Sequence, residues 1–71
     1  MKITLKALRV NADLTQLEAA EKIGITRETL IKWETHKTFP KIDVLQKMCG
    51  VYGCTLDDVF IPSSLANSED K

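Results

Sequence analysis

The chain has 71 residues and a mass of 8.0 kDa, enough for one small domain. Hydrophobic residues make up 44% of it and charged residues 28%, a balance that excludes a wholly disordered protein. Ten basic and ten acidic side chains give zero formal net charge, which by itself argues against a strongly basic nucleic-acid-binding protein. The sequence shows no signal peptide, no membrane span and only two cysteines, so we expect a cytoplasmic protein without a zinc site or a disulfide scaffold.

The charges are unevenly distributed along the chain. Residues 1–41 carry eight basic and five acidic side chains, whereas residues 42–61 carry one basic and three acidic side chains. One face of the folded domain can therefore be basic although the whole chain is neutral.

Helical spacing of apolar residues recurs from the first residues onward. The first expected helix spans residues 3–11, on the apolar positions Ile3, Leu5, Leu8 and Ala12. Thr15 followed by Glu18 forms a capping box, in which each side chain bonds to the other residue's backbone N–H. This signal predicts a second helix over 16–22.

A tight turn follows the second helix. Gly24 can adopt the left-handed backbone conformation that ends a helix, because it has no Cβ. Thr26 is a candidate N-cap for a third helix over 27–34, with Leu30 and Trp33 on its inner side.

Two further helices are expected after the loop that ends at Pro40. The fourth, over 42–51, contains Gly50, which costs about 1 kcal/mol relative to alanine in a helix interior. A short fifth helix over 56–60 follows Thr55 and its two acidic neighbours. The sequence thus predicts a compact all-α domain over 1–61 and a flexible polar tail over 62–71.

Two short helices joined by a glycine-containing turn form a helix-turn-helix pattern. An ordered set of residues from 3 to about 61 resembles the Cro/repressor-type (XRE, lambda-repressor-like) helix-turn-helix family of bacterial and phage transcription regulators. The matching residues are Leu5-Lys6, Leu8-Arg9, Leu14-Thr15-Gln16, Ala20, Gly24-Ile25-Thr26, Trp33-Glu34, Thr38-Phe39-Pro40 and Tyr52-Gly53-Cys54-Thr55-Leu56-Asp57-Asp58. The resemblance implies a five-helix domain with the helix-turn-helix at its second and third helices.

The resemblance also implies which residues read DNA bases. In this family the N-terminal end of the third helix enters the major groove, and Arg27, Glu28 and Lys32 align with base-contacting positions. Arg27 has the fork geometry to bind guanine O6 and N7 together, and Glu28 can accept a hydrogen bond from cytosine N4 or orient Arg27. The alternative for these residues is an ordinary solvated helix face.

Other matched positions are expected to contact phosphates or to stabilise the fold. The expected phosphate contacts are Gln16, at the first position of the second helix, and Lys37, Thr38 and Lys41 after the third helix. The alternatives are a plain capping role for Gln16 and surface solubility for the other three. The family often joins the positions of Arg9 and Glu34 in an ion pair, which we interpret as structural.

Three residues depart from the family pattern. His36 stands where glycine is usual, Gly50 where a helix former is usual, and Leu17 where a polar residue is common. Cys49 and Cys54 fit buried apolar positions better than a disulfide or redox switch. No catalytic set, nucleotide-binding loop, cofactor or metal-ligand spacing is evident, so no enzyme activity is expected.

The predicted function is sequence-specific binding of double-stranded DNA by a bacterial or prophage repressor. A homodimer on a palindromic operator is expected, because one domain offers few base contacts. The residues that could form the dimer surface are Val59, Phe60, Ile61 and Leu65, although Phe60 could instead close the core. Two alternatives stay open: an antitoxin-like module of the same fold that binds a protein partner, and a fragment of a longer regulator. No membrane contact or small-molecule effector is predicted.

Overall fold

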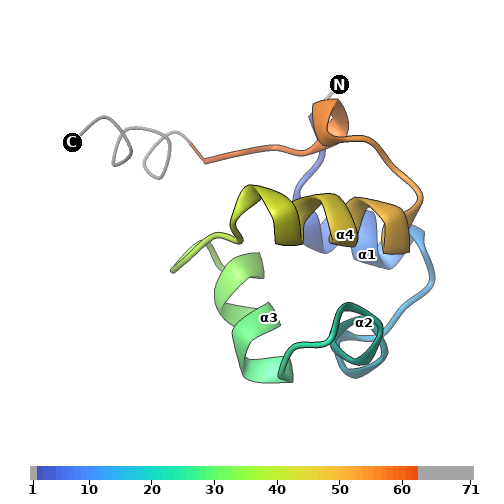
Figure 1. Ribbon diagram of the computed structural model, residues 1–71, viewed down its shortest axis with the longest axis vertical. Coiled ribbons are helices and arrows are strands. Elements are labelled where there is room, and N and C mark those ends of the chain that lie inside the picture. The colour runs from blue at the N-terminus through green and yellow to red at the C-terminus, as the bar shows by residue number, and fades with distance from the viewer. Residues whose placement is uncertain (1, 63–71) are drawn as a thin grey trace.

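Threonine side chains begin three of the four α-helices. The computed structural model describes residues 2–62, and its α-helices are α1 (Leu5–Asn11), α2 (Gln16–Ile23), α3 (Arg27–Glu34) and α4 (Ile42–Tyr52) (Figure 1). The threonine hydroxyl accepts a hydrogen bond from the backbone N–H three residues later at Thr4 of α1, Thr15 of α2 and Thr26 of α3. These bonds satisfy N–H groups that a first helical turn leaves without a partner.

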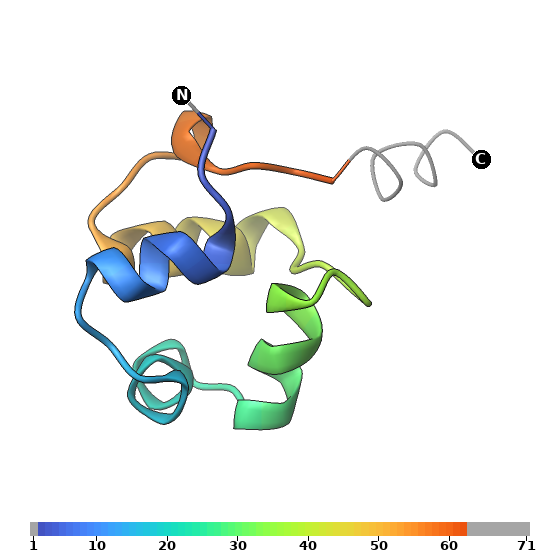
Figure 2. The same ribbon diagram turned by 180° about the vertical axis from the view of Figure 1, so that it is seen from behind.

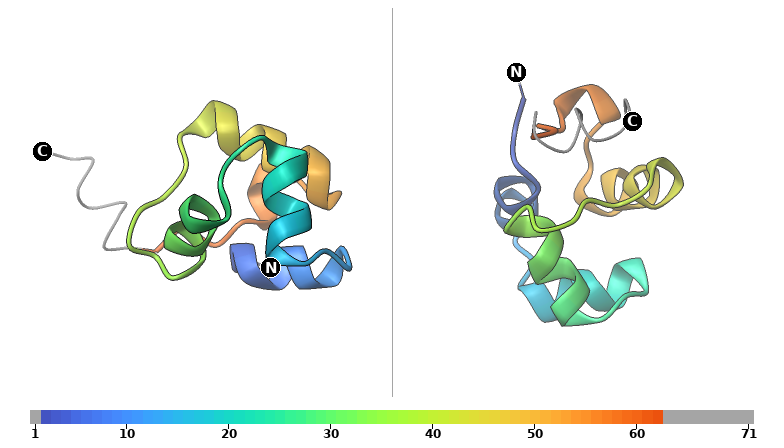
Figure 3. Two further views of the ribbon diagram at one scale, coloured as in Figure 1. Left: turned by 90° about the horizontal axis from the view of Figure 1, so that it is seen from below. Right: turned by 90° about the vertical axis from the view of Figure 1, so that its left-hand side faces the viewer.

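The helices form two levels around one core. α1 and α4 pack together, and α2 and α3 lie below them in the view of Figure 1 (Figures 1 and 2). All four α-helices contribute to the buried cluster, which consists of Leu5, Leu8, Ala19, Ala20, Ile23, Leu30, Leu45, Met48, Cys49, Tyr52 and Val59. Seen from below, α2 and α3 together form the exposed end of the domain (Figure 3).

The turn between α2 and α3 has the predicted geometry. Gly24 has a φ of +90°, in the left-handed region that a side chain would strain. The backbone N–H groups of Gly24 and Ile25 both donate to the Ala20 carbonyl, at 2.8 and 3.0 Å. Ala20 itself is buried, so its small side chain lets α2 and α3 meet closely.

The prediction of a fifth helix over 56–60 is wrong in both the type and the length of the element. The chain forms a single 3-10 turn, η1 (Leu56–Asp58), so the described fold has four α-helices and not five. After this turn the Phe60 N–H donates to the Ile3 carbonyl at 2.8 Å. The Ile3 N–H donates to the backbone carbonyl of Asp58 at 2.7 Å. These bonds between the two ends of the domain keep residues 59–60 extended, and they also delay the start of α1 until Leu5.

Only the first residue of the predicted tail lies among the described residues. Pro62, which the sequence places at the start of the tail, is buried. The rest of the predicted tail, which includes Leu65, lies outside the described residues.

Gly50→Ala is expected to stabilise the domain by about 0.5–1 kcal/mol, because alanine restricts the unfolded chain more than glycine does. Gly50 lies exposed inside α4, and a Cβ built there meets nothing within 4 Å. Urea unfolding followed by the fluorescence of the single tryptophan, Trp33, would measure the change. Gly24→Ala is the matched control and should destabilise, since its φ is positive. A loss of stability in Gly50→Ala would contradict this account.

Candidate nucleic-acid interface

The first turn of α3 presents charged side chains to solvent. Arg27, Glu28 and Lys32 are all exposed, whereas Leu30 on the opposite side of the helix is completely buried. Among residues 2–62, no hydrogen bond or ion pair engages the three charged side chains. Their functional groups therefore remain available to an external ligand.

The first turn of α2 offers unpaired backbone N–H groups beside a fixed cap. Thr15 and Glu18 form the predicted capping box, with bonds of 2.9 and 3.1 Å. The hydrogen bonds that Glu18 accepts from the Thr15 backbone N–H and side chain lower the pKa of this carboxyl below its usual range. Within the described residues, the N–H groups of Gln16 and Leu17 have no acceptor, so this helix end can bind an anion.

The loop after α3 is tied to the helix through its backbone. The N–H groups of Lys37 and Thr38 donate to the Lys32 carbonyl at 2.9 and 3.4 Å, and both side chains are exposed. Lys41 is also exposed, at the far end of the loop where it forms the N-cap position of α4. The basic and hydroxyl groups of the loop thus face outward next to the last turn of α3.

His36 occupies a left-handed position in this loop. Its φ is +65°, which explains why glycine is usual here, because a residue with a Cβ is strained in this region. The imidazole packs against Phe60, with ring centroids 6.2 Å apart and planes tilted by 48°. The contact between these rings offsets part of the strain.

Arg9 and Glu34 form the one ion pair found among residues 2–62. Arg9 Nε lies 2.6 Å from Glu34 Oε2, and only 9% and 2% of the two side chains are exposed. Arg9 Nη1 also donates to the Leu14 carbonyl at 2.8 Å. The pair therefore connects α1, the α1–α2 loop and the last turn of α3.

Gln16 joins this pair, which the sequence did not indicate. Gln16 Nε2 donates to Glu34 Oε1 at 3.2 Å. The residue that is predicted to contact a DNA phosphate therefore also contacts a buried carboxylate. The two residues lie 18 positions apart, and no local pattern predicts a contact over that distance.

Tyr52 and the two cysteines lie near the same part of the core. Burial, with the negative charge of Glu34, raises the pKa of Tyr52 to about 12, and its buried hydroxyl has no hydrogen-bond partner among the described residues. Burial, together with a hydrogen bond to Cys49, raises the pKa of Cys54 to about 11. Both cysteines are unbridged, and a thiol with so high a pKa stays protonated and unreactive at neutral pH.

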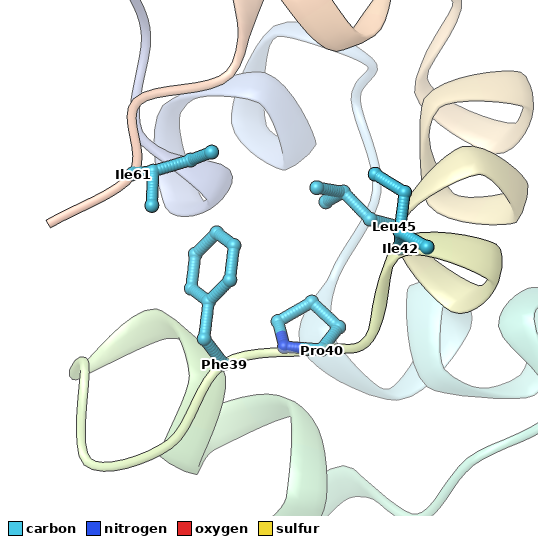
Figure 4. Close-up of a pocket in the computed structure, with 5 residues that line it drawn as sticks. All are labelled: Phe39, Pro40, Ile42, Leu45 and Ile61. Carbon is cyan, nitrogen blue, oxygen red and sulfur yellow. The ribbon is translucent and has the colours of Figure 1, made fainter. Parts of the chain in front are cut away.

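An apolar hollow of about 220 Å³ opens on another side of the domain. Its walls, which we call the apolar patch, are Phe39, Pro40, Ile42, Leu45 and Ile61, and these side chains point toward one another across the opening (Figure 4). Ile42 and Ile61 are 62% and 48% exposed. Val59, expected on a dimer surface, is only 1% exposed and belongs to the core, whereas Phe60 is 39% exposed.

Residues 2–62 show neither a helix long and apolar enough to cross a membrane nor a group of three or more residues suited to hold a metal ion. Two surface features stand out among the described residues. One is the polar end built by α2, α3 and the following loop, and the other is the apolar patch.

Comparison with known proteins identifies the family of the chain. A family model described as helix-turn-helix matches residues 5–59, which include α2, the Gly24 turn and α3. The chain belongs to the Cro/repressor-type (XRE) helix-turn-helix family. It is therefore a DNA-binding transcriptional regulator.

Relatives from archaea and bacteria resemble this regulator over most of its length. A protein of Methanocaldococcus jannaschii named as an uncharacterized HTH-type transcriptional regulator is 36% identical over 61 residues, covering 86% of this chain and 92% of the relative. One of Archaeoglobus fulgidus with the same type of name is 31% identical, covering 86% of each chain. The cryptic phage CTXphi transcriptional repressor of Vibrio cholerae is 30% identical, covering 94% of this chain and 60% of the relative. No solved structure gives a significant match.

Proposed function

We propose that this helix-turn-helix regulator is a repressor that reads a specific DNA sequence with the first turn of α3 in the major groove. The observation that carries the proposal is the exposure of Arg27, Glu28 and Lys32 on α3, where none of the other described residues pairs with their side chains. The phage repressor among the relatives supports repression and a prophage origin. Acting on DNA, the protein would work in the cytoplasm of its host cell.

The base contacts follow from the chemistry of the three side chains. Arg27 would bind guanine O6 and N7 through its guanidinium fork, and Glu28 would accept from cytosine N4. Lys32, about one turn further along α3, would reach a guanine or a phosphate. Each of these side chains is exposed, so binding requires no rearrangement of the core.

The phosphate contacts would flank these base contacts. Gln16 and the unpaired N–H groups of the first turn of α2 would bind one phosphate, since a helix N-terminus attracts anions. The exposed groups of the loop after α3 would bind further phosphates, through Lys37, Thr38 and Lys41. Such contacts position the domain without reading sequence.

Selection of bound molecules from a pool of random DNA duplexes tests the proposal and identifies the operator. We expect enrichment of a palindromic sequence and an affinity that falls steeply as salt rises. Equal retention of all sequences would contradict base-specific reading. If Arg27, Lys32 and Lys37 could all be replaced without changing DNA affinity at low salt, a protein-binding module of the same fold would be the better account.

We further propose that the regulator binds its operator as a homodimer and that the partner covering the apolar patch is a second copy of the chain. The patch carries a hollow beside the exposed side chains of Ile42 and Ile61. This arrangement suits a two-fold symmetric contact, because the same patch can supply both the protruding and the receiving surface. Dimer formation would also double the number of base contacts.

Ile42→Gln is expected to weaken this dimer at least tenfold, because each copy would bury an amide against apolar side chains. Ile42 is 62% exposed, so the fold of the single domain should stay unchanged. Sedimentation over a range of protein concentrations would measure the dimer dissociation constant. Val10→Gln is the control, since Val10 is 53% exposed on α1 and does not line the patch. Equal dissociation constants for the two variants would place the interface elsewhere.

A further inference from the structure

Glu34 accepts hydrogen bonds from two helices at once. It is the last residue of α3, and its carboxylate receives Arg9 Nε at 2.6 Å, Arg9 Nη2 at 3.3 Å and Gln16 Nε2 at 3.2 Å. The Glu34 side chain is 98% buried by these contacts and the surrounding core. The carboxylate therefore fixes the first residue of α2 against the last turn of α3.

The bond to Glu34 leaves Gln16 able to bind a ligand. An amide side chain has two N–H hydrogens and one carbonyl oxygen, and Glu34 accepts one hydrogen. The second hydrogen and the backbone N–H have no partner among the described residues. Gln16 is half-buried and held in one orientation, whereas an unrestrained glutamine would lose its rotational freedom on binding.

Glu34 also directly precedes the second segment that is proposed to bind phosphate. This segment is the loop that carries Lys37 and Thr38, whose N–H groups are fixed to the Lys32 carbonyl in the last turn of α3. The first turn of α2 and this loop are thus both attached to the end of α3. Their separation is set before DNA arrives.

We infer that Glu34 is a positioning residue for DNA binding: its buried carboxylate holds the Gln16 amide in the orientation that a backbone phosphate requires. This inference rests on the proposed function and adds a role to an ion pair that otherwise serves stability alone. It also assigns Gln16 two simultaneous partners, Glu34 inside the protein and a phosphate outside it.

A double-mutant cycle between Gln16 and the ion pair tests this inference. The double variant Arg9→Met with Glu34→Leu removes one charge of each sign, so it leaves the net charge and simple electrostatic attraction unchanged. We expect it to bind the selected duplex about two- to tenfold more weakly than the wild type, the cost of ordering one freed side chain. Gln16→Ala should weaken binding in the wild type and produce a clearly smaller further loss in the double variant.

The variant Glu34→Gln is the second part of the experiment. It distinguishes an effect on the orientation of Gln16 from an effect on the stability of the protein. The amide keeps an oxygen that can accept from Gln16, so affinity measured where the protein is folded should stay within about twofold of the wild type. Thermal unfolding of each variant establishes a temperature at which all are folded. Additive losses in the cycle, or an equal loss in Glu34→Gln and the double variant, would overturn the inference. A wild-type protein that does not bind DNA would instead defeat the proposed function.

Discussion

Arg9→Met is expected to destabilise the domain by about 3–5 kcal/mol, because it leaves the Glu34 carboxylate buried without its ion partner. Only 2% of the Glu34 side chain is exposed, so water cannot replace the guanidinium. A domain of this size has a total stability of roughly 4–11 kcal/mol, so the expected loss is a large fraction of the free energy of unfolding. Urea unfolding followed by Trp33 fluorescence would measure the loss.

Adding Glu34→Leu to Arg9→Met should restore most of this stability. Replacing both members of a buried ion pair by apolar residues is often neutral or stabilising, because no charge has to be desolvated. We expect the double variant to lie within about 1–2 kcal/mol of the wild type, since Leu14 and Gln16 also lose a bond to the pair. A double variant as unstable as Arg9→Met would show that the specific hydrogen bonds, and not the unpaired charge, determine stability.

Arg27→Ala and Lys37→Ala are expected to weaken DNA binding in two different ways. Loss of the Arg27 fork should cost about 1–3 kcal/mol on the selected sequence and relax the base preference at one position. Loss of the exposed Lys37 ammonium should lower affinity for all sequences alike, and should reduce the slope of log affinity against log salt by about 1. Titration of each variant with selected and scrambled duplexes at several salt concentrations would separate the two effects.

Lys2→Ala is the matched control for these measurements. It removes the same charge as Lys37→Ala, but Lys2 lies near η1, at the end of the molecule opposite α2 and α3 (Figure 1). Its ammonium donates to the Asp57 carbonyl at an exposed site, so little stability should be lost. If Lys37→Ala and Lys2→Ala behaved alike, Lys37 would not contact DNA. If Arg27→Ala left the base preference unchanged, α3 would not read the sequence as proposed.

Local signals in the sequence located the helices well. Thr26 and the spacing of Leu30 and Trp33 predicted the observed bounds of α3, and the α2 prediction differed by one residue at its end. These signals act over three or four residues, the distance that separates an N-cap from the N–H it satisfies. The left-handed Gly24 turn follows equally from one residue, because a glycine at that place needs no support from the rest of the fold.

The tertiary structure decided which of these local elements meet. The bonds between Ile3 and Phe60 shortened the first helix and prevented the fifth, and the burial of Val59 removed it from the expected dimer surface.

By itself, therefore, the sequence determined the family, the α2–turn–α3 unit and the charged residues that α3 exposes to solvent. Only the folded chain brought Gln16 to Glu34 and assembled the apolar patch from the loop, α4 and the C-terminal segment. The physical reason is that caps, turns and helical spacing depend on near neighbours in the chain. Contacts between distant residues depend on how the helices pack, which no local pattern encodes.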